Sequence, residues 1–76
     1  MKQQYQLPLL IEKDEGGFYV IECPIFRGCY TQGETIDEAM KNIREVIDLC
    51  LEEQENEATL KDFHPREIMF STLSYA

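Results

Sequence analysis

The stretch from Gly28 to Glu53 constrains the fold of this chain more than any other part of its sequence. It begins with a short β-prone run between Gly28 and Gly33. Thr35 then offers a hydroxyl N-cap, and Glu38 follows three residues later, which is the spacing of a capping box. Apolar residues come next at intervals of three and four, the period of a helix with one apolar face. They are Ile36, Met40, Ile43, Ile47 and Cys50. We therefore predict an amphipathic helix that packs on an apolar surface.

Four segments predict the strands that would receive this helix. Alternating apolar residues indicate a strand over Tyr5–Glu12, placed at a sheet edge because Pro8 lacks an N–H. The strand Phe18–Cys23 pairs back through a glycine turn, Cys29–Gln32 forms a third strand, and Ile68–Tyr75 forms a fourth. Residues 58–65 are predicted to form a loop. The order β-β-β-α-β predicts a two-layer α+β domain, with one amphipathic helix on an antiparallel sheet of three to four strands.

Length and charge narrow the possible functions. Seventy-six residues make a single domain, residues 1–76, near the lower limit at which a hydrophobic core suffices. Phe18–Cys23 is apolar on both faces, whereas one helix covers only one face, which predicts a homodimer or a higher homo-oligomer. The net charge of -8 disfavours direct nucleic-acid binding and suits a basic protein partner. The N-terminus lacks the apolar core of a signal peptide, and no apolar run spans a membrane, so we expect a cytoplasmic protein.

The residues that could carry chemistry do not form a recognisable site. Cys23, Cys29 and Cys50 include no C-x-x-C pair, and His64 lies far from them in the sequence. We interpret the cysteines as reduced thiols that behave as small hydrophobes. A Cys–His nucleophile pair has no local support, and the glycines at 28 and 33 fit no phosphate-binding pattern. We predict no catalytic residue, no metal site and no cofactor.

Acidic residues are the candidate partner-binding groups. One cluster is expected at the C-terminal end of the long helix, where its charge would oppose the helix dipole. It consists of Glu52, Glu53, Glu55 and Glu57. The second group lies on the predicted hairpin. It consists of Glu12, Asp14, Glu15 and Glu22. A solvated, frayed helix end is the alternative interpretation of the first cluster.

The run from Gly28 to Ala39 resembles the signature of the HicB family of antitoxins, G-C-x-[TS]-x-G-[DE]-T-x-x-E-A. The matching motif residues are Gly28, Cys29, Gly33, Thr35, Glu38 and Ala39. The segment from Ile11 to Val20 is similar to the family's first hairpin, and the resemblance extends over about residues 5–53. It implies a degenerate RNase H-like sheet without nuclease activity. Such a domain binds a small basic ribonuclease toxin, HicA, and covers its catalytic histidine.

The same resemblance leaves three functional hypotheses. The first is an antitoxin-like protein that inhibits an mRNA-cleaving toxin of a type II toxin–antitoxin pair. The second is a stand-alone oligomeric HicB-like binding domain without a toxin partner. The third is residual RNase H-like hydrolysis, for which Glu12 and Glu22 would supply the acids. Many family members carry a C-terminal DNA-binding domain, whereas this chain ends after the predicted fourth strand, so we expect no operator binding by this chain alone.

Overall fold

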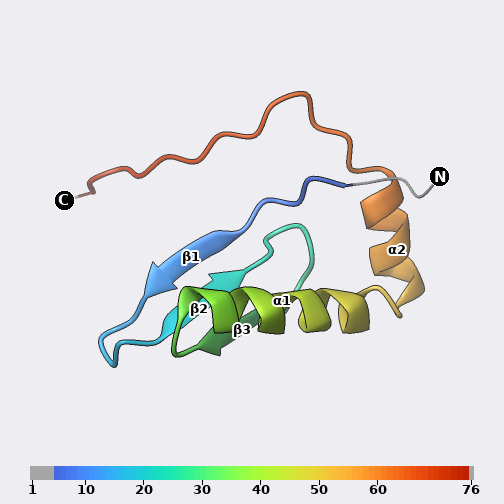
Figure 1. Cartoon of the computed structure of the whole chain (residues 1–76). Coiled ribbons are helices and arrows are strands. Elements are labelled where there is room, and N and C mark those ends of the chain that lie inside the picture. Colours follow the sequence, from blue (N-terminus) through green and yellow to red (C-terminus); the bar gives the residue numbers. More distant parts are fainter. Residues whose placement is uncertain (1–4, 76) are drawn as a thin grey trace.

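The molecule is a three-stranded sheet with a long helix across one face and a short helix at one end (Figure 1). Our computed structural model describes residues 5–75. The elements, in chain order, are β1 (Leu10–Lys13), β2 (Tyr19–Glu22), β3 (Tyr30–Gly33), α1 (Ile36–Cys50) and α2 (Gln54–Lys61). The sheet is antiparallel in the order β1-β2-β3, which places β1 at an edge as Pro8 predicted. The α+β class is therefore confirmed.

The β1–β2 hairpin closes through a turn that Asp14 stabilises. Its backbone N–H donates to the Phe18 carbonyl over 2.8 Å, and its side-chain Oδ1 accepts from the Phe18 N–H over 2.9 Å. Gly17 adopts a φ of +87°, a conformation that L side chains rarely adopt. The turn sets the register, in which Ile11 lies opposite Ile21 and Lys13 opposite Tyr19.

Helix α1 begins where the capping residues predicted. The Thr35 Oγ1 accepts from the Glu38 N–H over 3.0 Å. The Glu38 carboxylate accepts from the N–H of Glu34 over 3.3 Å, one residue before the position that a regular capping box uses. Both bonds satisfy backbone donors near the start of the helix, where the first turn leaves N–H groups without helical partners.

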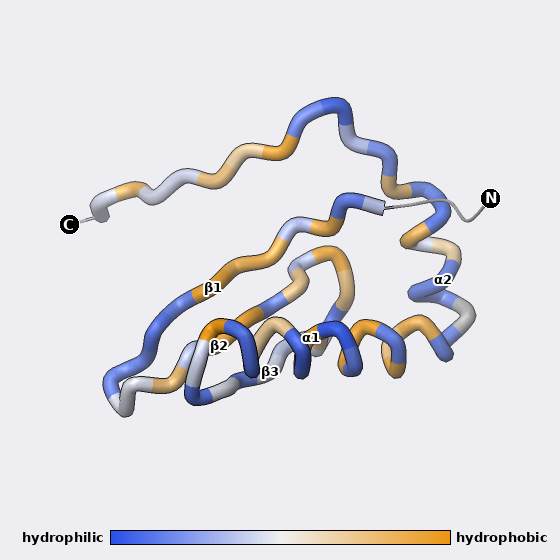
Figure 2. Tube along the Cα trace, in the orientation of Figure 1, coloured by the Kyte–Doolittle hydropathy of each residue, from blue (hydrophilic) through white to orange (hydrophobic). Residues whose placement is uncertain are grey.

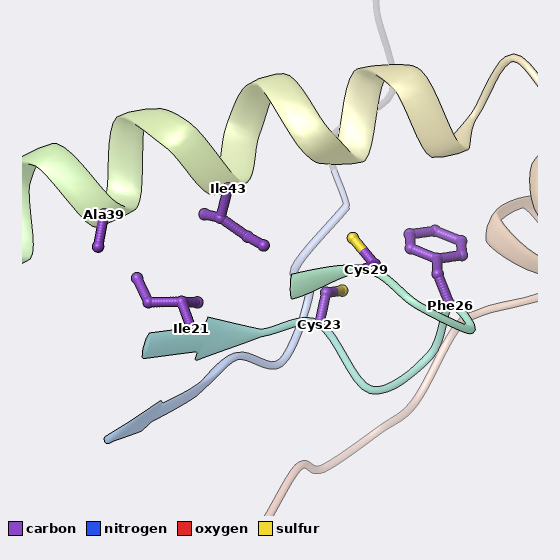
Figure 3. Close-up of a cluster of buried hydrophobic side chains, with 6 residues drawn as sticks. All are labelled: Ile21, Cys23, Phe26, Cys29, Ala39 and Ile43. Atoms are coloured by element: carbon purple, nitrogen blue, oxygen red, sulfur yellow. The ribbon is translucent and has the colours of Figure 1, made fainter. Parts of the chain in front are cut away.

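The core lies between α1 and the sheet and is small (Figure 3). It contains six buried side chains: Ile21, Cys23, Phe26, Cys29, Ala39 and Ile43. Two of them are cysteines, which confirms their interpretation as small apolar residues. The predicted apolar stripe of α1 is only partly covered, because Ile36 and Met40 remain 46% and 41% exposed.

Two predictions about the second half of the chain are wrong. Residues 58–61, expected in a loop, belong to α2, which spans residues 54–61, and Ile68–Tyr75 forms no strand. The helix arises because Gln, Glu, Ala, Leu and Lys are good helix formers, and Glu57 pairs with Lys61 one turn later at 3.3 Å. The last segment is extended but runs past β1 without joining the sheet (Figure 1). It has strand-forming residues but no strand partner among residues 5–75.

The bounds of the first and third strands also differ from those predicted. The first strand begins at Leu10 rather than at Tyr5, and the third ends at Gly33 rather than at Gln32. The N-terminal residues Met1–Gln4, which contributed to the expectation of a cytoplasmic protein, and Ala76 lie outside the described residues.

Candidate partner-binding surface

The run from Gly28 to Ala39 contains β3 and the start of α1, and its contacts hold these two elements together. Gly28 adopts a φ of +73° before β3, and Cys29 is fully buried. The Cys29 carbonyl accepts from the Cys23 N–H over 2.8 Å, which ties β3 to β2. A Cβ added to Gly33 would lie 2.6 Å from the backbone N of Ala39. The glycine therefore allows α1 to pack directly against the end of β3.

The buried thiols of Cys23 and Cys29 are poor nucleophiles. Burial raises the pKa of the Cys23 thiol above its ordinary value. Burial also raises the pKa of the Cys29 thiol to about 12, and its neighbour Cys50 adds to that shift. Since the thiolate is the reactive form of cysteine, Cys23 and Cys29 are inert at neutral pH. Their role is packing.

The open face of the sheet, opposite α1, brings two of the predicted acids together. Glu12 lies opposite Val20 on β1 and β2, and Glu22 lies between Leu10 and Tyr30. These five residues line a shallow hollow of about 220 Å³. Both carboxylates are exposed, and Tyr30 is 64% exposed. We call this set (Leu10, Glu12, Val20, Glu22 and Tyr30) the open-face patch.

The open-face patch combines acids with an exposed aromatic ring and two aliphatic side chains. Protein interfaces favour this composition, since aromatic residues are enriched at their centres and charges guide the encounter. Sequence analysis identified the two acids and placed Val20 on the same face as Glu22, but it missed Leu10 and Tyr30 as their neighbours. The alternation of residues along the hairpin contained the signal, because every second residue faces the same side of a sheet.

The other two hairpin acids have different surroundings. Asp14 makes the turn bonds described above, so its carboxylate has a structural role. Glu15 is exposed in the same turn, beyond the end of β1. Neither residue lines the hollow of the open-face patch.

The second acidic cluster lies at the junction of α1 and α2, and its electrostatic interpretation needs correction. Glu52 lies in the turn after α1, and Glu53 is the N-cap residue of α2. Glu55 and Glu57 occupy the first turn of α2. Negative charge is favourable there, because the dipole is positive at the N-terminus of a helix. The expectation that all four acids oppose a helix dipole is therefore wrong.

Asn56 links the end of α1 to the start of α2 through its side chain. Its side-chain amide donates to the Cys50 carbonyl over 2.9 Å and reaches the Glu53 carboxylate at 3.4 Å. Arg27, Glu53, Glu55 and Asn56 help to line a surface hollow of about 490 Å³. The acids at the junction thus have a cation and an amide beside them, whereas the open-face acids have mainly apolar neighbours.

The two acidic groups do not form one surface. The β1–β2 turn lies at one end of the molecule, and α2 lies at the other (Figure 1). Glu12 and Glu22 occupy the sheet face between these ends. A single partner of small size would therefore contact one group or the other.

The described residues offer no metal site and no membrane-spanning helix. Among residues 5–75, no three His, Cys, Asp or Glu side chains gather closely enough to hold a metal ion. Within the same part of the chain, neither helix has the length and apolar character that crossing a bilayer requires.

Comparison with known proteins identifies close relatives. A family model described as the HicB-like antitoxin of bacterial toxin–antitoxin systems matches residues 7–75. A UPF0150 protein of Synechocystis sp. is 60% identical over 58 residues, which cover 76% of this chain and 81% of that protein. A UPF0150 protein of Archaeoglobus fulgidus is 46% identical over 63% of this chain and 70% of its own length.

A third relative is longer. An uncharacterized 14.9 kDa protein from the rep-hol intergenic region of Haemophilus phage HP1 is 42% identical over 45 residues. The matched part is 59% of this chain but 33% of the phage protein. No solved structure shows significant similarity to the chain.

Proposed function

Because the chain belongs to the family of HicB-like antitoxins of bacterial toxin–antitoxin systems, we propose that it is the antitoxin of such a pair. Its partner is a small basic ribonuclease of the HicA type that cleaves mRNA. The family match over residues 7–75 carries this proposal. Inhibition occurs by binding, which keeps RNA from the toxin's active site, and the chain itself catalyses no reaction. The complex forms in the cytoplasm, where the mRNA substrate is found.

Electrostatics supports a basic partner. The chain carries 15 acidic and 7 basic residues, so a cationic toxin would be attracted over several ångströms before contact. Such steering raises the association rate more than it raises the final affinity. An RNA-cutting enzyme is basic because it binds phosphates, and an acidic inhibitor complements it.

We assign the toxin contact to the open-face patch. Tyr30 supplies an exposed aromatic ring, Glu22 lies directly opposite it, and Glu12 lies opposite Val20 on β1. Among residues 5–75, neither carboxylate forms an ion pair. The junction acids fit this role less well, because Glu57 pairs with Lys61 and Glu53 contacts Asn56. A degenerate RNase H-like sheet and a homo-oligomeric state also belong to this proposal.

The first experiment tests whether the pair exists. The reading frame beside this gene, if it encodes a small basic protein, is expressed with and without this chain in a bacterial host. We expect growth arrest and mRNA cleavage when that protein is expressed alone, and recovery when both are expressed. Continued arrest in the presence of this chain would contradict the proposal and favour the stand-alone binding domain.

The second experiment tests the surface. The double variant Glu12→Gln/Glu22→Gln should slow capture of the toxin about tenfold, the lower order expected for charge steering. Its matched control, Glu52→Gln/Glu55→Gln, removes the same charge from the α1–α2 junction and should leave the rate within about twofold. Stopped-flow association rates at about 0.05 M salt make the comparison. A larger effect from the control pair would move the contact to the junction.

A further inference from the structure

The structure leaves two unsatisfied apolar features in each copy, an open groove and an exposed segment. The groove, of about 540 Å³, runs between α1 and the residues that precede β1. Apolar side chains line much of it, among them Leu7, Leu9, Met40, Ile43 and Ile47. The segment Ile68–Tyr75 is extended and contains no charged residue.

The segment exposes more apolar surface than a monomer ordinarily tolerates. Met69, Leu73 and Tyr75 are 77%, 87% and 94% exposed, and Ile68 and Phe70 are exposed as well. Figure 2 shows this hydrophobic character along a segment that stands away from the sheet. The family match includes the segment, since it extends to residue 75. The exposed residues therefore belong to the family's domain.

One edge of the sheet is open to receive a strand. The Asp14 N–H bonds to the Phe18 carbonyl, and hydrogen-bonded positions alternate along an antiparallel pair. Glu12 consequently faces β2, whereas the backbone groups of Ile11 and Lys13 point outward from the β1 edge. An exposed edge of this kind pairs readily with another chain.

The opposite edge is partly covered. The same alternation, read from the bond between Cys23 and Cys29, directs the backbone groups of Gln32 outward from β3. The Asn42 side chain on α1 donates to the Gln32 carbonyl over 3.0 Å. This bond occupies an acceptor that an added strand would need, so β1 is the available edge.

We propose that Ile68–Tyr75 of one copy adds as a fourth strand to the β1 edge of a second copy and covers the groove of that copy. The second copy's segment binds the first copy in the same way. Eight residues extend over roughly 26 Å, and the edge from residue 5 to residue 13 extends over roughly 30 Å, so their lengths match. Met69, Leu73 and Tyr75 share one face of the strand and point into the groove. Thr72 and Ser74 then continue the open face of the sheet.

The occupant is a second copy, because each copy's own segment runs past its own β1 without pairing with it (Figure 1). His64, which precedes the segment, contacts Tyr5 with ring centroids 6.1 Å apart. A hollow of about 400 Å³ lies between the two stretches beyond this contact. Within residues 5–75, the segment makes no backbone hydrogen bond with the sheet.

The area involved suffices for a stable dimer. The three groove-facing side chains, one aromatic and two aliphatic, expose roughly 400 Å² of apolar surface in each segment. Two segments and the two surfaces that receive them bury roughly 1,600 Å², within the range of specific interfaces. Each copy carries a net charge of -8, but the segment itself is uncharged. The repulsion between two copies therefore comes from charges outside the segment, and salt screens it. Dimerisation should strengthen as salt rises.

The test uses two variants of the free chain and needs no toxin. Leu73→Asp places a charge on the groove side of the segment, and Ile11→Pro removes an outward N–H from the β1 edge. Sedimentation equilibrium at micromolar concentration should give a dimer for the wild type and a monomer for each variant alone. Their mixture should give a heterodimer, because the segment of Ile11→Pro is intact and the edge of Leu73→Asp is intact.

Controls make the result decisive. Thr72→Asp, matched in charge and adjacent in sequence but facing the other side, should dimerise at least tenfold more tightly than Leu73→Asp. Isotope-filtered NMR on a mixture of labelled and unlabelled wild type should show contacts between Leu73 of one copy and Met40 of the other. A monomeric wild type, contacts confined to one copy, or a mixture that stays monomeric would overturn the proposal. Since the free chain is measured, failure here says nothing against toxin binding.

Discussion

At the scale of single residues, close approach between backbones determines how α1 packs on the sheet more than side-chain chemistry does. Gly33 permits the contact between the end of β3 and the first turn of α1, and Ala39 is the small residue that meets it. The core that results contains two cysteines and one alanine among its six members, so it buries little apolar surface. Each of these positions therefore tolerates little change.

Gly33→Ala should lower the free energy of unfolding by about 1–3 kcal/mol, the usual cost of overpacking. The added Cβ would meet backbone atoms of Ala39 at 2.6 and 2.9 Å, and backbone cannot move aside as a flexible side chain can. Gly16→Ala is the control, because its new Cβ would meet atoms no closer than 3.4 Å. Urea denaturation measures both variants. Equal stability of the two would contradict the close packing of α1 on β3.

The buried thiols predict a loss of stability at alkaline pH. Burial raises the pKa of Cys23 and Cys29 in the folded chain, so the unfolded chain loses these protons first as pH rises. Their contribution is complete below the ordinary thiol pKa of about 9 and declines as pH approaches 12. Urea midpoints should therefore fall as pH rises from about 9 towards 12. The fall should be smaller in Cys29→Ala, and an equal fall would remove the thiols as its cause.

At the scale of elements, local signals predicted some parts of the chain and failed for others. The N-cap at Thr35 and the apolar spacing after it predicted α1, because capping and periodicity are properties of the segment itself. Helix α2 lacks a side-chain cap at Glu53, so its start left no comparable signal. Its residue types and the Glu57–Lys61 pair could have indicated it.

The position of α2 changes the expected effect of the junction acids on stability. Glu55→Gln/Glu57→Gln should destabilise α2 by roughly 0.3–1 kcal/mol per residue at low salt, because both carboxylates lie in its positive first turn. The effect is local, so amide hydrogen exchange between Thr59 and Lys61 should become faster. Glu52→Gln, outside the helix, should leave that exchange unchanged. Slower exchange in the double variant would restore the view that these acids oppose a helix dipole.

At the scale of the whole molecule, the sequence could not show which strand-like segments pair with a neighbour. The segment Ile68–Tyr75 has the residue types of a strand, yet a strand exists only where another edge bonds to it. The hairpin and β3 have neighbours in the chain and were predicted, although the first strand begins at Leu10 rather than at Tyr5. The open-face patch could be predicted only in part, because Tyr30 joins Glu12 and Glu22 through pairing between strands.

The whole molecule presents two separate surfaces, and our proposals assign a different partner to each. The open-face patch lies on the side of the sheet away from α1, whereas the groove lies between α1 and the N-terminal stretch. A chain dimerised through its groove would therefore present two open-face patches, one per copy. One toxin bound to each subunit is the stoichiometry that this arrangement predicts.

The central claim is inhibition of a ribonuclease toxin by direct binding, and a titration of RNA cleavage tests it most directly. The purified toxin cleaves an mRNA fragment while this chain is added in increasing amounts. We predict that cleavage falls linearly and stops at one subunit of this chain per toxin, with the dimer intact. Cleavage that continues undiminished at a large molar excess of the chain would contradict the claim.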